Sequence, residues 1–242
     1  ILLPEVEVRA THDSHFEAAS QYTVTEQDIE LQASDRPANV LRMVPGLITT
    51  NPGGGPGKPD NYMLRGFDAD HGTDLAGFLD GMPLNLRSHA HGQGYLDLNF
   101  LIPETMKRVD AYKGPYQVQF GDFATAGAVN FVTRDVVEEG VVQLSGGQFN
   151  TQRHLLMFSP TTDTVRSLVA LEGFYTDGPY VNPNRALRVN GLAKAAMNPT
   201  TRADLSLIGT YSQGRWNSQG ELPLRAVESG LISRFGSVDP YQ

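Results

Sequence analysis

The chain has 242 residues, of which 40% are hydrophobic and 19% charged, with no cysteine and a net charge of −8 at pH 7. This acidic balance disfavours nucleic-acid binding, and the lack of cysteine excludes disulfides, thiolate metal sites and thiol nucleophiles. No run of about 18 apolar residues occurs, so no transmembrane helix is predicted, although a membrane-spanning β-strand needs only about 10 alternating residues.

The N-terminal segment, residues 1–24, lacks the basic stretch and apolar core of a signal peptide, and we expect a mature, processed protein. Within it, Glu5–Val8 (EVEV) alternates charged and apolar residues. Thr25 and Asp28 then have the spacing of a capping box, which predicts a short helix over residues 26–33.

A second helix is expected to begin at Ser34-Asp35, with Pro37 in its first turn, and to end at Pro45-Gly46. Leu47–Thr50 continues as a β-branched strand. The following stretch, Asn51–Asp60 (NPGGGPGKPD), holds too many glycines and prolines for regular structure and is predicted to be a loop.

The next part of the chain mixes short strands, turns and polar loops. Asp80-Gly81 is a strong hairpin signal. The predicted strands are Met63–Gly66, Leu75–Asp80, Arg108–Tyr112 and Ala128–Thr133; the predicted loops are Phe67–Asp74 and Asn85–Tyr95; and Pro103–Lys107 is predicted to be a helical turn. Without a strict βαβ rhythm, this pattern indicates an α+β domain.

From Gly140 onward the hydrophobic period becomes 2. The strands predicted there include Gly140–Gly146, Val165–Tyr175, Leu187–Met197 and Arg202–Ser212. Each of the last three has one apolar and one polar or charged face, with Ile208 the exception in the last. This alternation is typical of outer-membrane barrel strands, and an ordinary β-sandwich is the alternative.

The charges are unevenly divided between these two parts. Residues 1–135 carry 10 basic and 18 acidic side chains, whereas residues 136–242 carry 9 of each. The asymmetry predicts two domains, 1–135 and 136–242. The acidic surface either complements basic side chains around it or attracts a cationic ligand.

Three blocks carry a family resemblance: LRMVPGL at Leu41–Leu47, NYMLRGFDADHGTDLAGFLDGMPLN at Asn61–Asn85, and RVDAYKGPYQVQFGDFATAGAVNFVT at Arg108–Thr133. In this order and spacing they resemble the plug domain of TonB-dependent outer-membrane receptors. The resemblance implies an α+β plug domain followed by antiparallel strands of an incomplete transmembrane β-barrel. About five strands are visible where such barrels have about 22, so we expect a longer receptor.

The function implied is import of a scarce ligand, such as a metal chelate, across a bacterial outer membrane. The implied partners are the periplasmic protein TonB, outer-membrane lipid and the ligand, with no enzymatic activity and no cofactor. A receptor fragment that captures ligand or signals without transport is the alternative.

The resemblance also implies functional residues. Glu5, Val6, Glu7 and Val8 would form the TonB-contacting segment, although an ordinary edge strand is an alternative. Arg65 and Arg108 would form ion pairs between plug and barrel. The apical plug loops would contact the ligand through Asn61, Tyr62, Asp68, Asp70, His71, Arg87, His89, His91 and Tyr95.

Three of these loop residues, His71, His89 and His91, also suggest a metal or metal-complex site, because alternate residues of an extended segment share a side. Hydrogen bonding of loop histidines to the backbone is the simpler interpretation. A metal-dependent hydrolase is a remote alternative. Ser88, His89 and Asp97 include the residue types of a nucleophile triad, but no glycine-flanked elbow surrounds the serine.

Overall fold

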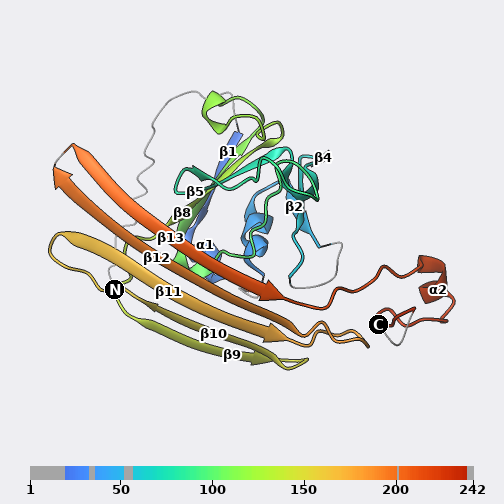
Figure 1. Cartoon of the computed structure of the whole chain (residues 1–242). Helices are drawn as coiled ribbons and strands as arrows, with labels where there is room; N and C mark the ends of the chain where they lie inside the picture. The colour runs from blue at the N-terminus through green and yellow to red at the C-terminus, as the bar shows by residue number, and fades with distance from the viewer. Residues whose placement is uncertain (1–19, 33–35, 52–56, 201, 239–242) are drawn as a thin grey trace, which may run out of the picture.

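The computed structural model describes residues 20–32, 36–51, 57–200 and 202–238. They form a globular domain, residues 20–135, that lies against the concave side of a curved antiparallel sheet (Figure 1). Glu5–Val8 lies outside the described residues. Within them, no helix is long and apolar enough to cross a membrane.

The globular domain contains two small sheets. The larger has the order β1-β7-β8-β5-β6, in which only β5 and β8 are parallel, and the smaller has the order β2-β3-β4. The strands are β1 (Ser20–Thr25), β2 (Leu47–Thr50), β3 (Asn61–Leu64), β4 (Phe67–Asp68), β5 (Leu75–Leu79), β6 (Met82–Pro83), β7 (Met106–Lys113) and β8 (Gly127–Thr133). β1 was not predicted; it places the end of the N-terminal segment in the main sheet, opposite β7.

Short helices complete this domain: α1 (Glu26–Glu30), η1 (Pro37–Met43), η2 (Asp70–Gly72), η3 (Pro103–Thr105) and η4 (Val118–Phe120). The predicted capping box of α1 is confirmed, with the Asp28 N–H donating to the Thr25 hydroxyl and the Asp28 carboxylate accepting from the Thr25 N–H. α1 is shorter than predicted. The second helix is a 3₁₀ helix that ends at Met43, and the next residue, Val44, is extended because it precedes a proline.

The hairpin at Asp80-Gly81 is confirmed. Asp80 and Gly81 have φ values of 47° and 81°, as a type I′ turn requires, and the turn joins β5 to β6. The Asp80 carboxylate accepts a hydrogen bond from the Thr133 N–H at 2.8 Å, which ties the turn to the end of β8.

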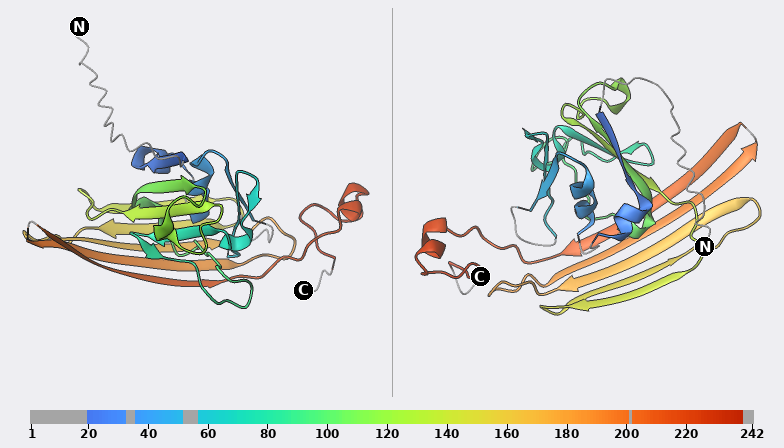
Figure 2. Two further views of the ribbon diagram at one scale, coloured as in Figure 1. Left: turned by 90° about the horizontal axis from the view of Figure 1, so that it is seen from above. Right: turned by 180° about the vertical axis from the view of Figure 1, so that it is seen from behind.

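The curved sheet, called the wall below, has the order β13-β12-β11-β10-β9 with every pair antiparallel. Its strands are β9 (Val141–Gly147), β10 (Thr151–Phe158), β11 (Val165–Thr176), β12 (Ala186–Thr200) and β13 (Ala203–Arg215), and a helix not predicted, α2 (Leu224–Glu228), follows. The four wall strands named from the sequence are confirmed to within a few residues. Figure 2 shows the wall covering one side of the globular domain.

The two faces of the wall are reversed relative to a soluble protein. Arg153, Glu172, Arg188, Asn190 and Lys194 are buried against the globular domain. The large apolar side chains on the opposite face are exposed, among them Val142, Leu144, Leu156, Phe158, Leu171, Val189, Leu205, Leu207 and Tyr211. Ile208, the exception in the predicted pattern, lies on the inner face and packs against the core of the globular domain.

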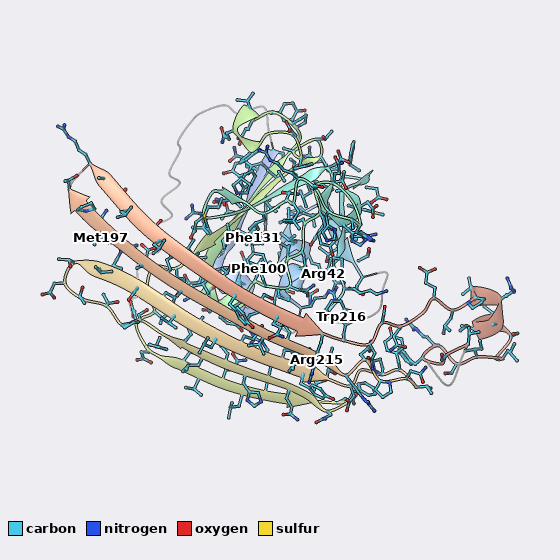
Figure 3. The ribbon with its side chains drawn as sticks, in the orientation of Figure 1. Arg42, Phe100, Phe131, Met197, Arg215 and Trp216 are labelled. Atoms are coloured by element: carbon cyan, nitrogen blue, oxygen red, sulfur yellow. The ribbon has the colours of Figure 1, made fainter. Side chains whose placement is uncertain are left out.

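The two ends of the wall differ in their connections. At one end, here called the long-loop end, residues 177–185 and the long segment after β13 follow the strands, together with a short tip at residues 148–150. The other, the short-turn end, has residues 159–164 and the turn between β12 and β13. Figure 3 shows Arg215 and Trp216 near the first end and Met197 near the second.

Candidate functional site

Four aromatic rings predicted to contact a ligand gather in the loops of the globular domain. The His89 ring stacks on Tyr95 with centroids 4.1 Å apart. His91 lies edge-on to His71 at 4.6 Å, and both lie within 6.0 Å of Tyr95. The structure therefore brings together residues that the sequence places up to 24 positions apart, from His71 to Tyr95.

The side chain of Asn85 organises the loops beneath this ring cluster. Its oxygen accepts from the Gly77 N–H at 2.7 Å, and its amide group donates to the carbonyls of Gly72, Leu75 and Gly94. Leu86 and Tyr95 close the loop as an antiparallel bridge. Because these bonds satisfy four backbone groups, three of them between Gly72 and Gly77 and one at Gly94, Asn85 is a key positioning residue that the sequence did not reveal.

His71 connects the ring cluster to the interior. It has a left-handed backbone with φ 58°, and its Nδ1 lies 3.2 Å from the carbonyl of Asp60. The Asp60 carboxylate is buried and accepts from Arg36 Nε at 2.6 Å. Burial raises the pKa of Asp60, and the charge and hydrogen bond of Arg36 oppose only part of that effect.

Tyr95 presents a neutral phenol at the cluster. Partial burial and, to a lesser degree, the charge of Asp97 raise its pKa to about 12. Its hydroxyl therefore keeps its proton at neutral pH and can donate to a ligand.

The other predicted contact residues are distributed differently. Asp68 and Asp70 are exposed, and Asp68 accepts from the Asp70 N–H at 3.1 Å in a local turn. Arg87 is exposed and Asn61 half-buried. Tyr62 corrects the prediction: its side chain is fully buried in the core and its hydroxyl donates to the Leu96 carbonyl, so it supports the loops from beneath.

Two groups of charges join the globular domain to the wall, and the first centres on Glu172. This fully buried carboxylate accepts from Arg153 at 2.7 Å, from Arg188 at 3.2 Å and from Asn190 at 2.9 Å. Arg153 also binds Glu104 of η3 with two parallel bonds of 2.7 and 2.8 Å. The group is balanced, with two carboxylates and two guanidinium groups.

The second group centres on Lys194 of β12. Its ammonium group lies 3.1 Å from Asp80 and 2.9 Å from Asp135, and it donates to the Thr133 hydroxyl at 2.8 Å. Arg166 lies 3.2 Å from Asp135. Partial burial alone would raise the pKa of Asp135, but the hydrogen bonds and charges of Lys194 and Arg166 outweigh it and lower the pKa.

Comparison with known proteins identifies the globular domain. Residues 15–128 match the family model of the TonB-dependent receptor plug domain. The globular domain is a TonB-dependent receptor plug domain. The acidic side chains Glu104 and Asp80 of this plug thus bind basic side chains of the wall.

Solved receptors share the fold of plug and wall over most of the chain. The copper transporter OprC matches with a TM-score of 0.64 at 17% identity, over 83% of this chain and 31% of its own. The pyoverdine receptor FpvA from Pseudomonas aeruginosa PAO1 matches with 0.62 at 19%, over 81% and 28%. The siderophore receptor PirA from Acinetobacter baumannii matches with 0.57 at 17%, over 80% and 31%. The chain thus spans about a third of these receptors, with the fold of a plug and the first strands of an incomplete barrel.

The arginines that the sequence suggested for plug–barrel ion pairs do not form them in the described residues. Arg108 pairs instead with Asp110 of the same plug strand at 2.9 Å. Arg65 is exposed at a left-handed turn with φ 54° and forms no ion pair within the part of the chain that the structure describes. Sequence spacing could not identify Arg153 and Lys194, because their partners are 49 and 114 positions away.

The plug and the wall also meet through apolar side chains. Ile102 of the plug packs in a cluster with Leu155, Met157, Leu168, Ala170 and Leu192 of the wall. At the long-loop end, the Trp216 ring lies against Gly57 of the plug so closely that a Cβ there would overlap it. Gly57 therefore lies at the long-loop end.

The predicted metal site is not preformed. Across residues 20–32, 36–51, 57–200 and 202–238, no group of three or more His, Asp or Glu side chains is arranged to hold a metal ion. His89 Nδ1 accepts the His91 N–H at 3.2 Å, which occupies one of its two ring nitrogens. Metal contact by His71, His89 and His91 stays a prediction.

Proposed function

We propose that this chain is the plug and first barrel strands of a receptor that imports a scarce ligand across a bacterial outer membrane. The energy would come from TonB, which would grip the segment at Glu5–Val8. The ligand would be a metal chelate or a nutrient of similar size, and no covalent chemistry is involved.

The reversed wall is the observation that carries the proposal. Apolar side chains cover its outer face while its charges lie inside against the plug. From Leu187 to Met197 the outer face rises about 34 Å along β12 at about 3.4 Å per residue, or about 26 Å along the membrane normal at a tilt of about 40°. This height suits the apolar band of an outer-membrane barrel, which is about 25 Å tall.

The two ends of the plug support a direction of transport. Outer-membrane barrels have short periplasmic turns and longer external loops, so the long-loop end would face outward. The plug loop at Gly57 meets Trp216 at that end. At the short-turn end, Arg134 binds Glu26 of α1 at 2.7 Å, immediately before the linker to β9. Ligand would bind on the first side, and TonB would act on the second.

The ring cluster suggests how the ligand is held. His71, His89, His91 and Tyr95 together offer stacking faces, and the phenol of Tyr95 offers a hydrogen bond. Stacking of aromatic faces contributes about 0.5–1.5 kcal/mol for each pair beyond the buried area. A metal held inside an organic chelator fits this surface better than a bare ion does.

The charged groups between plug and wall suggest the resistance that TonB must overcome. Separating Glu104 from Arg153, or Asp80 from Lys194, would leave a buried cation of the wall without one of its counter-charges. Breaking a buried pair in this manner costs about 3–5 kcal/mol. The plug would stay in place without force and move when pulled.

The test is accumulation of labelled cargo in the periplasm. The complete receptor containing this chain is expressed in a host without its own siderophore and copper receptors, with and without TonB. Ferric siderophores and copper chelates serve as probes. We expect TonB-dependent accumulation of one of them, lost when Glu5–Val8 is deleted. Binding without accumulation in either host would support the capture alternative, and neither binding nor accumulation would refute the proposal.

A further inference from the structure

A row of outward side chains marks the upper edge of the apolar band. Tyr175, Leu187 and Arg215 lie opposite one another on β11, β12 and β13. Arg185 immediately precedes β12, two residues before Leu187. The Tyr175 hydroxyl donates to Asp177 at 2.7 Å. The long-loop end therefore has, close together in the sheet, an aromatic side chain bonded to one carboxylate and two guanidinium groups.

These two arginines differ from the cations on the inner face. Arg153, Arg166, Arg188 and Lys194 each bind a carboxylate. Arg185 and Arg215 are exposed and have no carboxylate at ion-pair distance in the described parts of the chain. The wall thus pairs its inner cations with carboxylates, whereas in this outer row two guanidinium groups accompany a single carboxylate, that of Asp177.

The backbone at Arg185 is also unusual. Its φ is 44°, in the left-handed region that glycine and asparagine adopt more easily. An arginine held there carries a conformational cost of order 1–3 kcal/mol, which points to a role for its side chain. The cost also makes asparagine a substitution that the fold tolerates.

We propose that Arg185 and Arg215, at the neighbouring ends of β12 and β13 and on the same side of Tyr175, bind the phosphate group of a phosphorylated lipid in the outer leaflet. Guanidinium groups bind phosphate through paired hydrogen bonds, and tyrosine suits the boundary between hydrocarbon and water. The row lies where the apolar band ends, level with lipid head groups. The inference rests on the proposed membrane location but not on TonB or on the identity of the cargo.

The experiment measures how lipid stabilises the complete receptor. The receptor is reconstituted in vesicles of phosphatidylcholine alone, with lipid A, or with dephosphorylated lipid A, and its thermal unfolding is followed. A ligand that binds only the folded state raises the unfolding temperature. We expect lipid A to raise it and the dephosphorylated lipid to have no such effect.

The double variant Arg185→Asn with Arg215→Gln should lose the rise and bind lipid A roughly tenfold or more weakly, because each charged hydrogen bond is worth about a factor of ten. Arg202→Gln, the same change beside the other end of β13, is the matched control and should behave like the wild type. Inorganic phosphate is added to separate arms, where it should not reproduce the rise.

An equal rise in the double variant and the wild type would overturn the inference, as would an equal loss in Arg202→Gln. A rise with inorganic phosphate alone would replace the lipid with a free anion and also refute it. Cargo uptake is measured alongside. Failed uptake with an intact lipid A effect would refute only the import proposal, and normal uptake with unchanged lipid binding in the double variant would refute only this inference.

Discussion

The plug and the wall bury opposite kinds of side chain. The plug has an ordinary interior in which Val24, Leu41, Tyr62 and Phe131 are fully buried or nearly so. The wall buries Glu172 and Arg188 and exposes Leu207 and Tyr211. The difference is the one expected if, as proposed, hydrocarbon surrounds the outer face of the wall and water surrounds the plug.

The plug and the wall meet at a boundary formed by ion pairs, unlike the apolar interior of the plug and the apolar outer face of the wall. There the acidic plug supplies carboxylates and the wall supplies cations, so each charge is neutralised where water is scarce. A buried pair of this kind adds little net stability but is costly to break on one side. It therefore fixes the position of the plug against the wall more than it adds stability.

The largest expected effect comes from breaking this boundary. Glu172→Leu should destabilise the receptor by about 3–5 kcal/mol, because Arg153 and Arg188 then lose a shared buried counter-charge. Denaturant unfolding of the receptor measures the change. Glu228→Leu on the exposed helix α2 is the control and should have little effect. Similar losses in both variants would refute the role of the Glu172 group.

The reversed wall can be tested with adjacent residues of β13. Leu207 is 76% exposed, and in water Leu207→Arg would be harmless. In a bilayer the same change should cost about 2–4 kcal/mol. Ser206→Arg, on the inner face, should cost much less. Folding titrations in lipid vesicles measure both, and equal costs would contradict the assignment of the two faces.

The loops that hold the ring cluster should respond to a change in one glycine. Gly94 has φ 77°, and a Cβ there would lie 2.6 Å from Phe123 and 3.1 Å from the Thr73 backbone. We expect Gly94→Ala to destabilise the plug by about 1–3 kcal/mol and to weaken cargo binding. Gly92→Ala in the same loop meets nothing within 4 Å and serves as the control. Unfolding and binding curves that coincide for both variants would show that the loop geometry is unimportant.

The smallest expected effect is a difference in pH response between plug and boundary. The raised pKa of Asp60 means that the folded state holds this proton more tightly, so its contribution to stability falls as pH rises from 3.8 through the folded pKa. The lowered pKa of Asp135 has the opposite sign, and its contribution is lost as pH falls below 3.8 through the folded pKa.

Unfolding measured against pH in Asp60→Asn and Asp135→Asn checks these signs. Asp60→Asn should remove the fall in stability with rising pH that Asp60 causes and leave the contribution of Asp135 unchanged. Asp135→Asn should do the reverse. The effect of Asp135 is reduced by its exposure to solvent, so we expect a modest change. If the contributions of Asp60 and Asp135 to stability changed in the same direction with pH, the opposite pKa shifts assigned to them would be contradicted.

Local signals in the sequence predicted much of the fold. The capping box at Thr25 and the turn at Asp80-Gly81 are confirmed because a few adjacent residues decide them. The wall strands are confirmed because alternation repeats along each strand. β1 was missed because it is decided by pairing with β7, more than 80 positions away. Tyr62 was misjudged because a loop boundary does not reveal which way a side chain turns.

The sequence by itself determined much of the order of elements, the alternation of the wall and the residue types available to the ring cluster. Only the tertiary structure decided that Asn85 holds the cluster's loops, that Glu172 binds two arginines and that Asp80 meets Lys194. The reason is physical: propensity and period act over a few residues, whereas a buried ion pair depends on how two separately folded surfaces meet.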